Sequence, residues 1–123
     1  MSAFLVLVMA LAGGAGAVCR HLVGQWVGAR SSLALPLGTW LVNLLGSLVL
    51  GALAALTVRQ GLDAGWRLVL GTGFCGGFTT FSTAAVETVR LVQQGRPGLA
   101  LVHLLGGSLA CVAAAAAGWL LAA

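Results

Sequence analysis

A run of small and hydroxyl-bearing residues lies in the middle of an apolar segment of this chain. From Gly71 to Thr83 it reads Gly-Thr-Gly-Phe-Cys-Gly-Gly-Phe-Thr-Thr-Phe-Ser-Thr. Glycines this dense, followed at once by hydroxyl residues, disfavour one regular helix. Non-helical backbone at membrane depth occurs only where it is buried in protein or lines a water-filled cavity, and broken helices commonly form ion or substrate sites. The run therefore predicts an interrupted membrane-spanning helix with a site for an ion or small substrate.

Three polar residues follow the glycines at helical spacing. Thr79, Thr83 and Glu87 recur at every fourth position, so we expect their side chains to share one face of a helix. Arg90 comes three residues after Glu87 and is placed to pair with it near the membrane interface. The alternative without a functional role is that the hydroxyls bond back to the preceding carbonyls. The density of polar residues here exceeds what that alternative requires.

Phe74, Phe78 and Phe81 flank the expected break. They either contact lipid and pack, or present ring edges to a pore. An aromatic ring has a positive edge and a negative face, so an edge can favour an anion without a buried cation. Carbonyl oxygens released by a break would suit a hard cation. The segment therefore combines two chemistries, a cation held by carbonyls and an anion passing along hydroxyl donors.

Asn43 is a second polar residue at membrane depth, and Gly46, Ser47 and Gly51 lie on roughly the same helical face. Polar residues inside a membrane are costly and usually functional. The alternative is a structural hydrogen bond between helices, worth about 1 kcal/mol or less. The sequence alone leaves both interpretations of Asn43 open.

Arg20, His103 and Ser108 are weaker candidates within apolar segments. We expect the Arg20 side chain to extend toward the interface. His103 is either a pore hydrogen-bonding group or a packed histidine, and Ser108 is small enough for simple packing. The four tryptophans lie near segment ends and are expected to anchor the chain at the membrane interface; they are Trp26, Trp40, Trp66 and Trp119.

The composition identifies the class of protein. Of 123 residues, 60% are hydrophobic and 7% are charged, whereas a soluble domain has about 25% charged residues. The formal net charge of +4 comes from scattered arginines, which does not fit nucleic-acid binding. The three cysteines have no metal-binding spacing and are expected to pack as small hydrophobes. No nucleophile–base pair or metal cluster is present, so an enzyme is not expected.

Four apolar segments are long enough to span a bilayer, which takes about 20 residues in a helix. They cover about 2–27, 36–58, 66–92 and 98–122, with short links between them. The sequence predicts a single all-α membrane domain over 1–123, with four transmembrane helices and a break in the third. The first segment is taken as a membrane helix rather than a signal peptide, because it lacks a basic start.

The arginines are divided almost evenly between the two ends of the expected bundle. One end carries Arg59 and Arg67, with Asp63 between them, and the other carries Arg30, Arg90 and Arg96. Arginine and lysine bias sets membrane orientation, so a weak bias permits insertion both ways round. Pairs of small residues four apart, such as Ala12/Gly16 and Ser47/Gly51, favour close helix packing. These features predict a tightly packed antiparallel homodimer of dual topology.

Three motifs resemble those of one known family. Gly73–Thr83 resembles the signature of the Fluc (CrcB) fluoride channels, 36–46 is similar to their second-helix motif, and 16–20 to their first-helix motif. The resemblance extends over essentially the whole chain, in length, helix number and order of motifs. The third-helix signature is its most specific part.

The resemblance implies a dual-topology antiparallel homodimer with two fluoride pores in the bacterial plasma (inner) membrane. It implies passive, selective export of fluoride from the cytoplasm and hence fluoride resistance. It also implies a structural sodium ion (Na⁺) at the dimer centre, held by main-chain carbonyls at the positions of Gly76 and Thr79. The matching pore positions are Asn43, Phe81, Ser82 and Thr83. Further candidates for lining or supporting the pore are Phe78, Glu87, His103, Ser108 and Arg20.

The chain departs from the family pattern at one position. The family usually has Phe-Ser-Thr-Phe where this chain has Phe81-Ser-Thr-Ala84, so the second pore phenylalanine is absent. Three consequences are open: reduced conduction, compensation by an aromatic such as Phe78, or a heterodimer with a sister subunit.

A small four-helix drug/proton antiporter of dual topology is the alternative function. That chemistry needs a membrane-embedded carboxylate, usually in the first helix. The first segment has no acidic residue, and Glu87 is the only intramembrane candidate.

Overall fold

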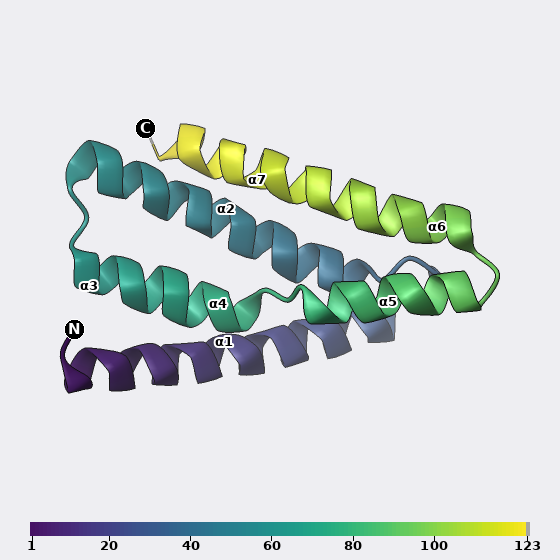
Figure 1. Cartoon of the computed structure of the whole chain (residues 1–123), viewed down its shortest axis with the longest axis horizontal. Coiled ribbons are helices and arrows are strands. Elements are labelled where there is room, and N and C mark those ends of the chain that lie inside the picture. The colour runs from purple at the N-terminus through teal and green to yellow at the C-terminus, as the bar shows by residue number, and fades with distance from the viewer. Residues whose placement is uncertain (123) are drawn as a thin grey trace.

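The computed structural model describes residues 1–122, and all of the regular structure in that range is helical (Figure 1). Three continuous rods, Ala3–Arg30, Leu37–Gln60 and Pro97–Leu121, are long and apolar enough to cross a membrane. The elements are α1 (Ala3–Arg30), α2 (Leu37–Gln60), α3 (Ala64–Arg67), the π-helix η1 (Leu68–Cys75), α4 (Gly76–Phe78), α5 (Ser82–Gln93), α6 (Pro97–Leu101), the π-helix η2 (Val102–Gly106) and α7 (Gly107–Leu121).

The third apolar segment is interrupted, as the sequence predicts, but the break is shorter than the glycine-rich run. The backbone stays helical to Phe78, becomes extended at Thr79 (φ −84°, ψ 159°) and resumes a helix at Ser82. The glycines of the run lie upstream of the break, two in the π-helical turns of η1 and two in α4. Thr79 therefore lies in the break, outside the helix that carries Thr83 and Glu87, and the expected continuous ladder of these three residues is wrong.

Local sequence accounts for where the helices start and stop. The Ser2 hydroxyl accepts a hydrogen bond from the Leu5 amide at the start of α1, as serine commonly does at this position. Gly61 ends α2 in the left-handed conformation, with φ of 66°, which glycine adopts without steric cost. The Asp63 carboxylate then accepts from the Gly65 amide and opens α3.

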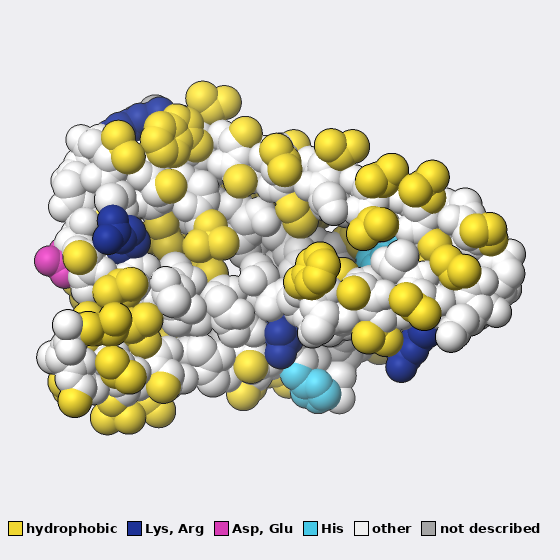
Figure 2. Space-filling view, viewed as in Figure 1, with side chains coloured by type: hydrophobic (Ala, Val, Ile, Leu, Met, Phe, Trp, Pro, Cys, Tyr) yellow, Lys and Arg dark blue, Asp and Glu magenta, His cyan; other side chains and the backbone are white. Residues whose placement is uncertain are grey.

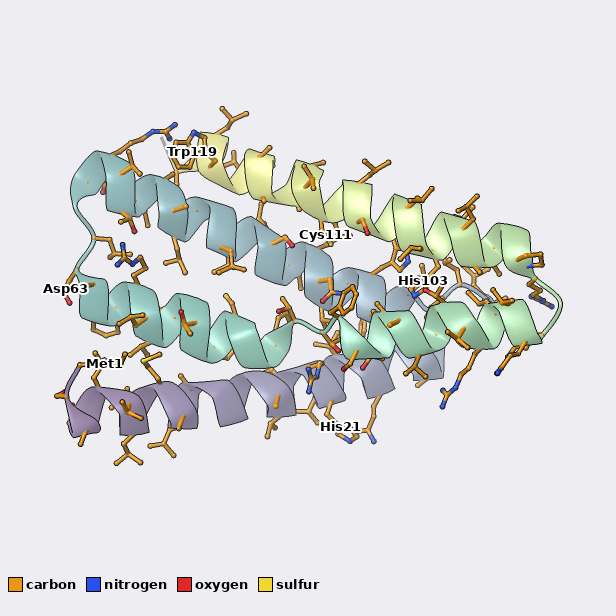
Figure 3. All side chains as sticks on the ribbon, viewed as in Figure 1. Met1, His21, Asp63, His103, Cys111 and Trp119 are labelled. Atoms are coloured by element: carbon orange, nitrogen blue, oxygen red, sulfur yellow. The ribbon has the colours of Figure 1, made fainter. Side chains whose placement is uncertain are left out.

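The helices form a flat, elongated bundle (Figure 1). The helix α1 packs against η1 and α4, α2 packs against α7, and α5 contacts α6 and η2. Both ends of the described chain lie at the same end of the bundle as the α2–α3 link, where Figure 3 shows Met1, Asp63 and Trp119. Hydrophobic side chains cover much of the face in Figure 2. This outward exposure suits a chain surrounded by lipid.

Close approaches within the chain depend on glycines. A Cβ atom on Gly16 would clash with the Phe74 carbonyl, and one on Gly77 would clash with the Gly13 carbonyl. A Cβ on Gly51 would likewise meet the Ala115 carbonyl of α7. Small residues allow this backbone contact between membrane helices. Gly16 and Gly51, expected to serve oligomer packing, are therefore engaged in packing within one chain.

Replacing Gly16 with Ala should destabilise the protein by about 1–3 kcal/mol, because the added methyl has no space and the backbone must shift. Gly14→Ala is the matched control, since nothing lies within 4 Å of a Cβ at that position. Thermal unfolding in detergent, followed by loss of the monodisperse gel-filtration peak, measures both variants. Equal midpoints for the two variants would contradict the packing argument.

Candidate functional site

Asn43 holds the interrupted backbone. Its Nδ2 donates to the Thr80 carbonyl at 2.9 Å, and its Oδ1 accepts from the Thr80 amide at 2.8 Å. The side-chain amide of α2 thus takes the place of a neighbouring peptide group for the one residue at the centre of the break. A primary amide has two N–H donors, so Asn43 keeps one N–H for another acceptor.

Arg20 and Thr79 complete the upstream half of the break. The Arg20 guanidinium of α1 donates to the Thr79 carbonyl at 3.1 Å. The Thr79 amide and hydroxyl both donate to the Cys75 carbonyl, each at 2.9 Å. Arg20 therefore points into the bundle and binds the break, so the expectation that it extends toward the interface is wrong.

The Thr80 hydroxyl starts the helix on the downstream side. It accepts from the Thr83 amide at 3.1 Å and donates to the Thr83 hydroxyl at 3.0 Å. The Ser82 hydroxyl lies 3.5 Å away. Thr80 thus satisfies one of the free amides at the start of α5. It also gathers three hydroxyl groups at one point.

Carbonyl oxygens remain available just before the break. Within the described residues, the carbonyls of Gly76 and Gly77 accept no backbone hydrogen bond from the non-helical segment that follows. Carbonyl oxygen is a ligand that hard cations prefer. The second expected ligand, the Thr79 carbonyl, already accepts from Arg20, but a carbonyl has a second lone pair.

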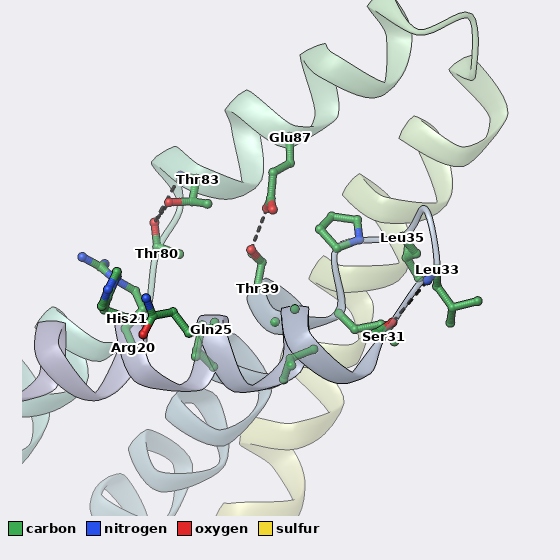
Figure 4. Close-up of a pocket in the computed structure, with 17 residues that line it drawn as sticks. Arg20, His21, Gln25, Ser31, Leu33, Leu35, Thr39, Thr80, Thr83 and Glu87 are labelled. Atoms are coloured by element: carbon green, nitrogen blue, oxygen red, sulfur yellow. Dashed lines mark hydrogen bonds between the residues drawn. The ribbon is translucent and has the colours of Figure 1, made fainter.

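The Glu87 carboxylate contacts side chains of α2 and η2 and does not pair with Arg90. Its Oε1 accepts from the Thr39 hydroxyl at 2.6 Å (Figure 4). The Nε2 of His103 lies 3.7 Å from the same oxygen. Within the described residues no ion pair joins Glu87 to Arg90, which is exposed, so the expected interfacial pair is wrong.

The Trp40 side chain is half-buried and packs against the last apolar segment. Its indole N–H donates to Nδ1 of the buried His103 at 2.8 Å. Trp26 and Trp66 are more than half exposed, as interface anchors would be. Because a buried indole usually pairs its N–H, Trp40 is a structural partner of His103, and its place at the membrane interface stays a prediction.

Two cavities adjoin the break and meet at Thr39 and Thr80. The first, which we call the α1–α5 pocket, is drawn in Figure 4 and is lined by Arg20, Thr83 and Glu87 among others. The second, which we call the α2–α7 groove, is lined on its polar side by Asn43, Thr79, His103 and Ser108, and on its apolar side by Phe81 and Ala84.

The two cavities divide the residues predicted from the sequence. Five of the candidates line the groove: Asn43, Thr79, Phe81, His103 and Ser108. The Ser108 hydroxyl donates to the Leu104 carbonyl at 2.6 Å. Arg20, Thr83 and Glu87 line the pocket. Gly76, Phe78 and Ser82 line neither cavity.

The two phenylalanines nearest the break have different environments. Phe78 is 8% exposed and stacks on Phe74, with ring centroids 5.8 Å apart. Phe81 is 82% exposed and lines the groove. The geometry therefore gives Phe78 a packing position and leaves the Phe81 ring free to contact a second molecule or an ion.

Thr39, Thr80 and Trp40 contact the site residues but were not among the candidates from the sequence. Thr39 and Asn43 are four residues apart on α2, a spacing that places them on one helical face and that would have identified Thr39. Thr80 belongs to the hydroxyl run itself. Nothing in the spacing distinguishes Trp40 from the three other tryptophans.

Comparison with known proteins gives a consistent family. Residues 7–119 match the family described as CrcB-like protein, Camphor Resistance (CrcB). A protein of Leifsonia xyli subsp. xyli named fluoride-specific ion channel FluC 1 is 46% identical over 121 residues, which cover 98% of this chain and 88% of that protein. The fluoride-specific ion channel FluC of Gloeobacter violaceus is 46% identical over 120 residues, covering 94% of each chain. FluC 3 of Bifidobacterium longum is 42% identical over 120 residues, covering 98% of this chain and 99% of that protein. This chain therefore belongs to the CrcB-like protein family.

Proposed function

We propose that this chain forms a fluoride-selective ion channel, which exports cytoplasmic fluoride passively and so gives fluoride resistance. The chain is a multi-pass protein of the bacterial plasma membrane, and its relatives at 42–46% identity are named fluoride-specific ion channels. The observation that supports the proposal is the α2–α7 groove beside the broken helix. It is lined by Asn43, Phe81, His103 and Ser108.

The groove offers a small anion the kinds of contact that it loses with its water. Asn43 keeps one N–H beyond the one that Thr80 accepts. Phe81 presents a largely exposed ring, whose edge is electropositive. Arg20, in the adjoining pocket, adds a positive charge bound at the break. These groups attract an anion without placing a free cation in its path.

The antiporter alternative has little support. The relatives are named ion channels, and α1 carries no acidic residue. Glu87 is half-buried and accepts a 2.6 Å hydrogen bond from Thr39, which engages the carboxylate that a proton-coupled cycle would need to release.

An antiparallel homodimer is part of the proposal. One chain leaves Phe81 82% exposed beside a groove lined with polar groups, and a groove of this kind is unfavourable against lipid tails. The arginines at the two ends of the bundle are nearly balanced, which permits both orientations. A second, inverted copy would cover both grooves. A heterodimer with a sister subunit would do so too, and the purified chain alone distinguishes the two.

A structural sodium ion at the dimer centre fits the oxygen atoms near the break. Gly76 offers a carbonyl without a backbone partner, and Thr79 offers the remaining lone pair of a carbonyl bound by Arg20. Two copies would supply four such oxygens, a donor type suited to a hard cation. The ion would act by holding the two breaks together rather than by taking part in conduction.

Fluoride efflux from liposomes that contain only this purified chain tests the function. A fluoride electrode should record rapid efflux once the membrane potential that opposes it is dissipated. Chloride efflux under matched conditions should be negligible. An equal response to the two halides, or none to fluoride, would contradict a fluoride-selective homomeric channel.

Replacing Asn43 with Asp should reduce fluoride efflux by at least about tenfold, because a negative charge within 4 Å repels an anion by about 1–4 kcal/mol. The substitution also removes the Nδ2 donor to the Thr80 carbonyl. Gln60→Glu, which makes the same charge change at the exposed end of α2, is the control. Unchanged efflux in the Asn43→Asp channel would remove Asn43 from the pathway.

Phe81→Ile should lower fluoride efflux about two- to tenfold, the scale of one aromatic contact. Phe78→Ile should leave the rate per folded channel nearly unchanged and lower the thermal midpoint, since Phe78 is buried against Phe74. Efflux normalised to folded protein compares the two. If both variants lose the same rate, the exposed ring is not the one that contacts the ion.

Ala84→Phe should raise fluoride efflux about two- to tenfold if the groove lacks one ring edge. Ala84 lines the same groove as Phe81, one helical turn away. Ala116→Phe adds an equal ring at an exposed position of α7 outside both cavities and serves as the control. No gain from Ala84→Phe would mean that the groove already compensates for the missing ring.

A further inference from the structure

The Trp40 ring of α2 packs closely against η2 and the start of α7. Gly106 and Gly107 lie under the indole, and a Cβ atom on Gly106 would come within 3.0 Å of the Trp40 Cη2 atom. The ring stacks on His103 with 6.5 Å between centroids and 28° between planes. The two glycines therefore leave space for the indole, which lies against the imidazole in one orientation.

The contact between the two rings determines which imidazole nitrogen carries hydrogen. The indole N–H is a donor only, and it points at Nδ1 of His103 from 2.8 Å. Nδ1 must therefore be an acceptor, so a neutral His103 carries its hydrogen on Nε2. The unconstrained side chain has no such restriction.

The fixed hydrogen lies on the side of Glu87. His103 is 4% exposed, and its Nε2 has no hydrogen-bond partner among the described residues. The nearest charged atom is Glu87 Oε1, 3.7 Å away, which already accepts from Thr39. An N–H at Nε2 attracts this carboxylate, whereas a lone pair there would repel it.

We propose that Trp40 is a positioning residue for ion passage: it holds His103 as the Nε2–H tautomer, so that the imidazole and Thr39 hold the Glu87 carboxylate where the two cavities meet. Glu87 is a negative charge beside a path proposed for an anion. The Thr39 hydroxyl donates to Oε1, and the Nε2–H dipole faces the same oxygen from 3.7 Å; together they offset part of that charge and keep the carboxylate away from the α2–α7 groove. The consequence for ion passage rests on the proposed function, but the tautomer itself does not.

Nitrogen-15 NMR of histidine-labelled protein in lipid tests the tautomer directly. The chain has two histidines, so in the His21→Gln variant all histidine signals come from His103. At about pH 8, where unperturbed histidine is neutral, we expect a protonated Nε2 and an unprotonated Nδ1. In Trp40→Phe, which keeps an aromatic ring but loses the N–H, we expect mixed or reversed tautomers. A protonated Nδ1 in the unmodified protein, or an unchanged tautomer in Trp40→Phe, would overturn the proposal.

Fluoride efflux provides the second measurement. Trp40→Phe should lower the rate about fivefold, the scale of one hydrogen bond, and Trp66→Phe, at a tryptophan 59% exposed, should not. Adding Trp40→Phe to His103→Leu should produce no further loss, because Trp40 then has no imidazole to orient. Full additivity would show that Trp40 acts only by packing and would overturn the positioning role. If the unmodified chain carries no fluoride, the proposed function fails, and the NMR result still decides the tautomer.

Discussion

The whole arrangement depends on the need to satisfy peptide groups that lie at membrane depth outside a helix. An unpaired N–H or carbonyl in lipid costs several kcal/mol, and the non-helical backbone at Thr79 and Thr80 leaves several such groups outside the helical pattern. Asn43 binds both peptide groups of Thr80, and Arg20 binds the Thr79 carbonyl. Side chains of α1 and α2 are therefore hydrogen-bonded to the third apolar segment at its break. The glycines at positions 16 and 77 allow the close approach of α1 that brings Arg20 within reach of the break.

The same groups that stabilise the break leave some hydrogen-bonding capacity unused, and this capacity is what an ion can use. Asn43 has a second N–H, and the Gly76 carbonyl accepts no backbone bond from the segment after it. The donors face the groove side and the carbonyls belong to the helix before the break. A single interruption of one helix can in this way offer opposite charges to an anion and a cation without burying a free charged side chain for either.

The features that can be predicted from the sequence are those that one physical requirement determines. Features that depend on which of several similar residues pack together cannot be predicted in this way. Apolar length is enough to predict four membrane segments, and the glycine–hydroxyl run locates the interruption. The run does not say which residue leaves the helix, because glycine tolerates the π-helical turns of η1 as readily as an extended strand. This is why the expected face of Thr79, Thr83 and Glu87 is wrong. The break that begins at Thr79 changes the helical phase, so Thr79 lines the groove and Thr83 lines the pocket. The pairs Glu87–Thr39 and Trp40–His103 join helices far apart in sequence, and no local spacing encodes them.

The surface of one chain supports the proposal that a second copy completes the channel. The glycine contacts are already used between α1 and the third segment and between α2 and α7, so the close-packing surfaces are consumed inside the chain. Beside the break the Phe81 ring is 82% exposed, and it directly follows Thr80, which Asn43 binds. Because Asn43 binds both peptide groups of Thr80, the backbone from which the exposed ring extends is held in place. A partner that covers the groove would then meet this ring in the groove that Asn43 also lines, where one N–H of Asn43 is unused. This combination would favour a small anion over a larger or more polarisable one only if the partner closes the groove tightly.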